Sequence, residues 1–494
     1  MMENITMLKI YYDYRLSNEV FNISQNEICD CLENIAKLDP KTLTIKDYNE
    51  LIKCLPLSPN ENQHEVVAAA FKVLASLCSY DLARQYLGEK LIEVTIDSYK
   101  IFADQHFSNI LKVEDCLAQT CRCLANFCYY HESNTELALK CSCLSISIKL
   151  MKRNLKENTQ LFLNGLLMNL THLNEYKYEF PVDVIEQLNT FGIQHTKFKF
   201  HSKFYIILIS VIINVIKTAS ISIDILNYEN CSIVDWLLKN HSNYSDIAYI
   251  CVKFIKQVSK KIESYQWILN GKHKLLTEVL DKFEKKNEED VKQIVHKICD
   301  VIVLLSNHDS IQKEETKIAA IYLVDWLLIK MKSKNLYVQL SAIRTLGNLA
   351  RMNFGINDEC LTTSIIIEME WFVDTIQKSN LEKNSGITVS ILCLFKNILY
   401  TSSFASLNKD IQCELVKSTI QILKTSICLP VIIKVLDVIE CIIRKGSLDE
   451  ENLNLYKNPE FMQQLKTCYG NQVKEIKDLS LKITHLLQII GLEI

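Results

Sequence analysis

The residues most able to do chemistry are the cysteines, of which the chain has 19. A dense group of them lies at Cys116, Cys121, Cys123, Cys128, Cys141 and Cys143. Structural zinc usually takes C-x(2–4)-C pairs from two separate places, whereas the two C-x-C pairs here put neighbouring thiols on different faces of a helix. We therefore predict no metal site. The cysteines are interpreted as small core residues of a reduced intracellular protein.

Motifs of enzyme chemistry are missing from the sequence. It contains no G-x-G-x-x-G, G-x-x-x-x-G-K-[ST], G-x-S-x-G or H-E-x-x-H, which are the patterns of phosphate, nucleophile and zinc sites. The 11 histidines are scattered, and His131, His172 and His308 lie near expected inter-helix loops. We expect a protein that is not an enzyme and holds no cofactor, with a groove that assembles distant catalytic residues as the remote alternative.

A recurring asparagine is the strongest pattern. It follows an apolar residue by two positions and precedes Leu, Ile, Val or Phe. The clear copies are Asn126, Asn169, Asn214, Asn348 and Asn397, and weaker copies lie at Asn34, Ser76, Gln257, Leu304, Val438 and His485. The steps between copies are about 45 residues or multiples of it, which is the period of armadillo and HEAT repeats.

Composition favours helices as the elements that carry these asparagines. Gly (10) and Pro (6) are scarce and 48% of residues are hydrophobic, while helical periodicity runs from end to end. The longest apolar run, 204–216, is shorter than the roughly 20 residues of a bilayer span. The prediction is an all-α, armadillo/HEAT-like, right-handed superhelical solenoid of about ten to eleven repeats. Repeats are expected in 1–280 and 293–494, with a charged linker or loop at 281–292.

Two roles for the asparagines remain open. Each amide could bridge backbone groups of neighbouring repeats, or it could face the groove and bind a partner's backbone.

Trp236 and Asn240 match the W-x-x-x-N element with which nuclear-import adaptors hold lysines by stacked indoles. The positions four residues before the recurring asparagines are not tryptophan, so the match is interpreted as accidental; they are Arg122, Gly165, Ser210, Arg344 and Cys393.

Five segments in order give the chain a family resemblance. They are CLAQTCRCLANFCYYHES (117–133), GLLMNLTHLNE (165–175), VIVLLSNHDSIQK (301–313), VQLSAIRTLGNLAR (338–351) and ITVSILCLFKNILY (387–400). In this order and spacing the chain resembles small-GTPase GDP dissociation stimulators of the SmgGDS type, which are armadillo solenoids. Two departures are a C-terminus that comes earlier than in the family, and a net charge of only -3 where the family is markedly acidic.

The resemblance implies a function. The expected partners are small GTPases of the Rho, Rap or Ras type with a prenylated, polybasic C-terminus, which the protein would hold in the cytosol and whose GDP it would loosen. Cytoplasmic location, with association with the endoplasmic reticulum or mitochondria, is expected, as is a monomer without nucleic acid or membrane insertion. The predicted partner-binding residues are Asn126, Asn169, Asn214, Asn348, Arg351 and Asn397, with Glu132, Glu175 and Asp309 for the basic tail. The alternative is an armadillo scaffold that binds an unrelated protein or peptide in its concave groove.

Overall fold

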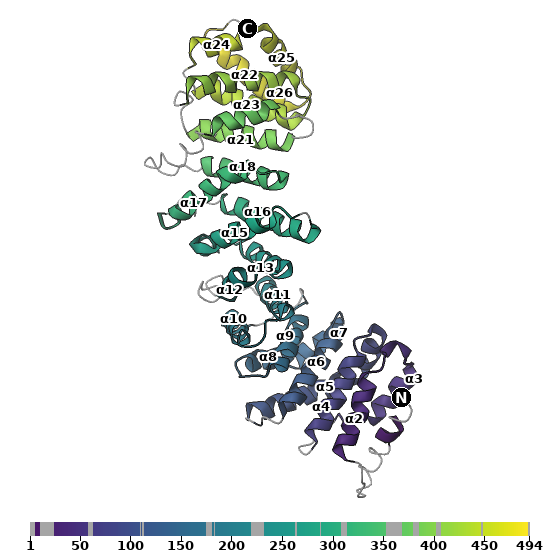
Figure 1. Cartoon of the computed structure of the whole chain (residues 1–494). Helices are drawn as coiled ribbons and strands as arrows, with labels where there is room; N and C mark the ends of the chain where they lie inside the picture. The colour runs from purple at the N-terminus through teal and green to yellow at the C-terminus, as the bar shows by residue number, and fades with distance from the viewer. Residues whose placement is uncertain are drawn as a thin grey trace. The chain divides into compact units, whose positions relative to one another are not determined.

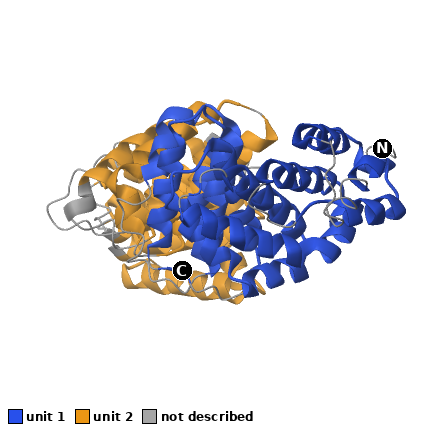
Figure 2. Cartoon of the chain, turned by 90° about the horizontal axis from the view of Figure 1, so that it is seen from below, with its two compact units in different colours: residues 1–254 blue, residues 255–494 orange. Residues whose placement is uncertain are grey.

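The fold was analysed in a computed structural model, shown in Figure 1. It describes residues 5–9, 24–57, 63–108, 110, 113–173, 180–181, 183–218, 232–261, 264–286, 288–307, 314–351, 368–378, 385–401, 407–445 and 448–492. Within these ranges the regular structure is helical and no strand occurs. The chain divides into two compact units, residues 1–254 and 255–494, which Figure 2 colours separately.

Unit 1 is built from two rows of helices. Its helices are α2 (Gln25–Ala36), η1 (Pro40–Thr42), α3 (Ile45–Cys54), α4 (His64–Leu77), α5 (Asp81–Phe107), α6 (Glu114–Cys128), α7 (Glu132–Lys140), α8 (Cys143–Met151), α9 (Glu157–Leu170), α10 (Val184–His195), α11 (Ser202–Thr218), α12 (Ser232–His241) and most of α13 (Ser245–Val258). Successive members of the series α2, α4, α6, α9, α11 pack on one another, and so do those of α3, α5, α8, α10, α12.

Unit 2 repeats this arrangement. Its helices are α14 (Tyr265–Trp267), η6 (Ile268–Lys272), α15 (His273–Phe283), α16 (Glu289–Leu305), α17 (Glu314–Lys330), α18 (Leu336–Arg351), α20 (Met369–Lys378), α21 (Ser385–Thr401), α22 (Lys409–Thr425), α23 (Leu429–Lys445), α24 (Glu450–Tyr456), α25 (Pro459–Tyr469) and α26 (Lys474–Ile489). Helices α16, α18, α21, α23 and α26 pack in succession. On their other side lie α15 with α17, and α20 with α22, α24 and α25.

The recurring sequence position defines one row of helices in each unit. We call α2, α4, α6, α9 and α11 of unit 1, and α16, α18, α21, α23 and α26 of unit 2, the asparagine row. Each carries one member of the predicted series, namely Asn34, Ser76, Asn126, Asn169, Asn214, Leu304, Asn348, Asn397, Val438 and His485, while Gln257 lies on α13. The predicted all-α solenoid is confirmed, and the period of the sequence is the period of this row.

The core of each unit lies between its two rows. The apolar run 204–216 illustrates this, since it forms α11 and buries Phe204, Leu208 and Ile212 completely. Helices with apolar residues on most sides are typical of buried positions in a helical protein. Among the described residues, no helix combines the length and the hydropathy that crossing a bilayer requires.

Local signals set several helix starts. Ser24 and Thr44 form capping boxes with Glu27 and Asp47, in which each side chain bonds the other residue's backbone N–H. Asn408 and Asp449 also accept hydrogen bonds from the first-turn N–H groups of α22 and α24. Such caps stabilise a helix by about 1 kcal/mol each, so these starts are encoded locally.

The charged run 281–292 does not coincide with the division between the units. It covers the end of α15, the connection, and the start of α16, whereas the two units meet at residues 254 and 255. The first two acidic residues of the run form ion pairs within unit 2. Lys330 of α17 pairs with Asp281 at 2.8 Å and with Glu284 at 2.5 Å. Trp326 Nε1 also donates to Asp281. The charged run therefore lies within unit 2, as a helix end, a connection and a helix start.

Most cysteines of the described part are buried. Burial raises the pKa of the Cys116 thiol to about 12 and that of Cys143 to about 12. Helix packing accounts for the dense group of cysteines, because Cys116, Cys121, Cys123, Cys128 and Cys143 all lie in the core. No group of three His, Cys, Asp or Glu side chains within the described ranges is arranged to hold a metal ion.

Gly192 supplies a test of this packing. A Cβ added there would lie 2.5 Å from Leu208 Cδ2 and 3.1 Å from Ile233 Cγ1, and both neighbours are fully buried. We expect Gly192→Ala to lower the free energy of unfolding by about 1–3 kcal/mol, as overpacking does. Urea unfolding followed by circular dichroism measures it.

Gly165 is the matched control, because it also lies within a helix but has nothing within 4 Å of its Cβ position. Gly165→Ala should be neutral or stabilise by up to about 1 kcal/mol through helix propensity. Equal effects of the two substitutions would contradict the close approach of α10 to α11 and α12.

Candidate functional site

The recurring asparagines are half-buried and connect neighbouring helices of the asparagine row. Asn126 Nδ2 donates to the carbonyl of Ala75 at 2.7 Å, and Asn169 Nδ2 donates to that of Ala125 at 2.6 Å. In unit 2, Asn397 Nδ2 donates to the Gly347 carbonyl at 2.7 Å. In each case the acceptor immediately precedes the series position of the previous repeat, so the contact has one geometry throughout.

A hydroxyl group relays the same contact in two other repeats. Asn214 Nδ2 donates to Thr171 Oγ1 at 3.4 Å, and Thr171 in turn donates to the Met168 carbonyl at 3.2 Å and the Leu167 carbonyl at 2.8 Å. Asn348 Nδ2 donates to Ser306 Oγ at 3.0 Å, which donates to the Val303 carbonyl at 2.8 Å. Met168 and Val303 again immediately precede a series position.

The carbonyls of Ala75, Ala125, Met168 and Val303 belong to the last four residues of their helices, whereas Gly347 lies one residue further from the end of α18. The final four carbonyls of a helix have no partner within it, and a buried carbonyl without a partner is costly. The amide of the next repeat supplies that partner. This geometry supports the bridging role of the asparagines. An asparagine side chain has two N–H groups and one oxygen, so a bridging amide retains hydrogen-bonding capacity for a partner.

One hollow on the asparagine row of unit 2 brings two predicted residues together. It has a volume of about 320 Å³ and lies on α16, α18 and α21. Its lining consists of Val303, Asn307, Arg344, Gly347, Asn348, Val389, Ser390, Cys393 and Asn397. Arg344 Nε donates to Ser390 Oγ at 3.4 Å, and Arg344 is largely exposed. None of these lining residues is acidic.

Arg344 and Cys393 were not predicted to bind a partner. Each lies four residues before an asparagine of the series, and residues four apart share a helix face. Their spacing from Asn348 and Asn397 could therefore have placed them in this hollow. Burial raises the pKa of the Cys393 thiol.

Trp236, which has the same spacing from Asn240, lies on α12 outside the asparagine row. Asn240 Nδ2 donates to the Trp236 carbonyl of its own helix at 2.9 Å.

A second hollow lies on the asparagine row of unit 1 and has the opposite charge. Its volume is about 290 Å³, and α2, α4 and α6 supply most of its lining. Its lining includes the small residues Ala68, Ala69 and Ala118 together with polar side chains, among them the acids Glu33, Glu65 and Asp115. Lys72, also in the lining, pairs with Glu33 at 2.9 Å, and Lys156 pairs with Asp115 at 3.1 Å.

The remaining predicted residues do not gather with these. Arg351 is exposed at the end of α18 and does not line the unit 2 hollow. Glu132 is exposed at the start of α7 and does not line the unit 1 hollow. Glu175 and Asp309 lie outside the described residues. The structure thus gathers Asn348 with Asn397, while Asn126, Asn169 and Asn214 follow one another along unit 1.

Comparison with solved structures identifies the fold. The chain is similar to an engineered protein, with 15% identity and a TM-score of 0.57 over 89% of this chain and 98% of that one. It is also similar, with 11% identity and a TM-score of 0.57 over 99% of this chain and 97% of the other, to a structure from work on a phosphorylation switch that controls the interaction between cadherin and beta-catenin. No protein-family model and no curated protein matches the sequence. These likenesses show an armadillo-like helical solenoid, and nothing finer.

The bridging contact can be tested at Asn397. Asn397→Ala removes the donor to the Gly347 carbonyl, and we expect the free energy of unfolding to fall by about 0.5–1.5 kcal/mol, which is the net contribution of one hydrogen bond. Asn240→Ala is the control, since that exposed amide bonds only its own helix, and it should change stability by less than about 0.5 kcal/mol. Urea unfolding of both variants measures the two changes. Equal losses of unfolding free energy would show that the Asn397 amide does not stabilise the packing of the asparagine row.

Proposed function

We propose that this chain binds other proteins through the asparagine row and performs no catalysis. The observation that carries the proposal is the unit 2 hollow, where Asn348, Asn397 and Arg344 line one concavity. Amide groups at regular spacing suit the backbone of an extended segment, because each can donate and accept at once. A guanidinium group beside them adds a donor for a carbonyl or carboxylate of the partner.

The finer proposal is that the partners are prenylated small GTPases, for which the chain acts as a guanine-nucleotide exchange factor and cytosolic chaperone. Its support is the order of the five resembling segments. The unit 1 hollow adds a physical reason, since Glu65 and Asp115 together with the alanines of its lining suit an extended basic tail. Nucleotide release needs no catalytic side chain, because preferential binding of a nucleotide-poor conformation shifts that population.

The second candidate is a scaffold for an unrelated protein or peptide. The observation that favours it is the charge of the unit 2 hollow, where Arg344 is present and no lining residue is acidic. A polybasic tail would be repelled there, so an acidic or neutral segment suits that hollow better. The two candidates differ in which unit binds and in the charge of the bound segment.

The test uses charge reversals at exposed sites. Glu65 lines the unit 1 hollow, whereas Glu89 lies exposed on α5 and provides the control. Glu65→Lys should weaken binding of a fluorescent polybasic GTPase C-terminal peptide by roughly threefold to tenfold at low salt, because one attractive charge becomes repulsive. Glu89→Lys should leave the affinity unchanged, and both differences should shrink as salt screens the charges.

Release of fluorescent GDP from prenylated and unprenylated Rho- and Rap-type GTPases tests the exchange activity. Acceleration that Arg344→Glu abolishes would place the GTPase on the unit 2 hollow. Binding without acceleration would leave a chaperone. Absence of binding by every GTPase, with or without its lipid, would contradict the finer proposal and leave the scaffold.

A further inference from the structure

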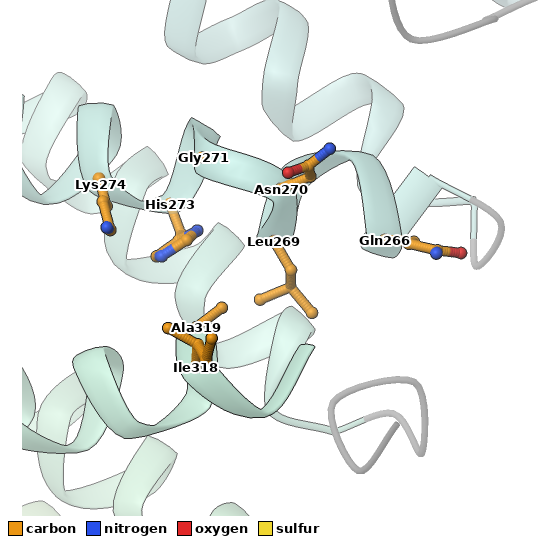
Figure 3. Close-up of a pocket in the computed structure, with 8 residues that line it drawn as sticks. All are labelled: Gln266, Leu269, Asn270, Gly271, His273, Lys274, Ile318 and Ala319. Carbon is orange, nitrogen blue, oxygen red and sulfur yellow. The ribbon is translucent and has the colours of Figure 1, made fainter. Parts of the chain in front are cut away.

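A third hollow lies on the other row of unit 2, away from the asparagines. It has a volume of about 420 Å³ and lies between the segment 266–274 and the start of α17. Figure 3 shows the turn at Gly271 above the hollow, with Ile318 and Ala319 of α17 below it. The proposed function uses none of these residues, so this hollow requires an explanation of its own.

An irregular turn shapes the upper wall. The chain kinks between two helices within Ile268–Lys272, where Asn270 has φ -83° and ψ 57° and Gly271 has φ 102° and ψ -24°. Glycine tolerates the positive φ that other residues avoid. The His273 N–H reaches back to the Ile268 carbonyl across this kink. The kink directs His273 toward Tyr322 of α17.

His273 is the unusual residue of the hollow. Its side chain is 2% exposed, and neither ring nitrogen makes a hydrogen bond of normal geometry, although the carbonyls of Ile268 and Leu269 lie near enough to favour its protonated form. Its ring packs edge-on against Tyr322 of α17, with 5.4 Å between centroids. A buried polar group without partners costs free energy, which a ligand that supplies the partner would recover.

The remaining lining has a consistent chemistry. Lys274 is exposed at the edge, with its Nζ 5.4 Å from the centre of the Tyr322 ring, and Asn270 contributes an amide. None of the described side chains that line this hollow is acidic. Leu269 and Ala319 form an apolar wall, and Ile318 beside them is 76% exposed. Through its described lining the hollow thus offers the Lys274 ammonium group and polar N–H groups next to the exposed aliphatic side chain of Ile318.

We propose that this hollow binds an acidic side chain of a partner protein, with Lys274 and His273 as donors to the carboxylate. An aliphatic residue next to that acid in the partner would pack on Leu269 and Ile318. A carboxylate fits because its two oxygens accept bonds from both donors at once, and charge-assisted bonds of this kind are the stronger ones. The ligand is therefore a short acidic-aliphatic peptide segment.

Binding should depend on pH through His273. In the free protein, burial lowers the pKa of His273, so the ring is neutral at pH 7. Lys274 and the Tyr322 hydroxyl are the titratable groups that face it, from α15 and α17. A bound carboxylate favours the imidazolium form and raises the pKa, so binding takes up a proton. Affinity should accordingly rise as the pH falls from 8 toward 6.

The experiment titrates the full-length protein with two capped peptides, one with glutamate between two leucines and one with glutamine in its place. Imidazole signals are followed by nuclear magnetic resonance, with the His273 signal assigned by its loss in His273→Gln. We expect the glutamate peptide to shift that signal and to bind at least roughly tenfold more tightly than the glutamine peptide, which corresponds to about 1.4 kcal/mol.

Substitutions of Lys274 test the hollow without disturbing the fold, because this side chain is exposed at the edge of the hollow. Lys274→Met should weaken the glutamate peptide by roughly tenfold, whereas Lys274→Arg should retain most of the affinity because it keeps the charge. Lys334→Met, at another exposed position of unit 2, should change nothing. In His273→Gln the pH dependence should vanish.

Three outcomes would overturn the proposal. The first is equal affinity for the two peptides. The second is binding that Lys274→Met and Lys334→Met affect alike. The third is a response of the His273 signal to inorganic phosphate or acetate with no response to the glutamate peptide, which would reassign the hollow to small free anions.

Discussion

The last turn of a helix ends in carbonyl groups that the helix itself cannot pair, and a solenoid repeats this problem with every helix it stacks. In this chain the next repeat provides the answer, through an asparagine amide that donates to the carbonyl just before the preceding series position. The direct contacts of Asn126 and Asn169 and the hydroxyl relays of Thr171 and Ser306 perform this task, and Asn397 bonds the carbonyl one residue before the last four of α18. Apolar burial drives the helices together, but it is not directional; the amide fixes their register.

This requirement links stability to recognition. The residues that hold neighbouring helices together are also the polar groups that line a hollow, as Asn348 and Asn397 do in unit 2. A solenoid presents such positions repeatedly because each repeat contacts its neighbours in the same way. The charges around them need not repeat, since exposed side chains carry little of the packing. Arg344 in one hollow and Glu65 in the other show how one scaffold can offer opposite surfaces.

The sequence predicts the elements well where one physical signal repeats. The asparagine context and its period locate the asparagine row even at Ser76, Val438 and His485, where the amide is replaced, because the surrounding apolar pattern persists. The charged run 281–292 lies within unit 2, whereas the two units divide between residues 254 and 255. Charge marks solvent exposure, whereas compactness depends on packing between residues that are distant in the sequence. Lys330 of α17, for example, pairs with Asp281 and Glu284 at the end of α15.

The candidate sites were less predictable. Composition leaves both roles of the asparagines open, and only the position of an acceptor such as the Ala75 carbonyl supports the bridging role. The relay hydroxyls lie two residues beyond a series position, where Ser and Thr are common for many reasons. His273 has no sequence signal at all, because its exceptional environment arises from the turn at Gly271 and from Tyr322 on another helix.

The most direct test of the bridging account is a double-mutant cycle between Asn348 and Ser306, whose side chains are 3.0 Å apart. The free energies of unfolding of Asn348→Ala, Ser306→Ala and the double variant give their coupling, free of the effects of each substitution alone. The account predicts a favourable coupling of about 0.5–1.5 kcal/mol, the net contribution of a hydrogen bond. A coupling of zero, with the two losses strictly additive, would contradict it, because the amide would then contribute nothing through the relay.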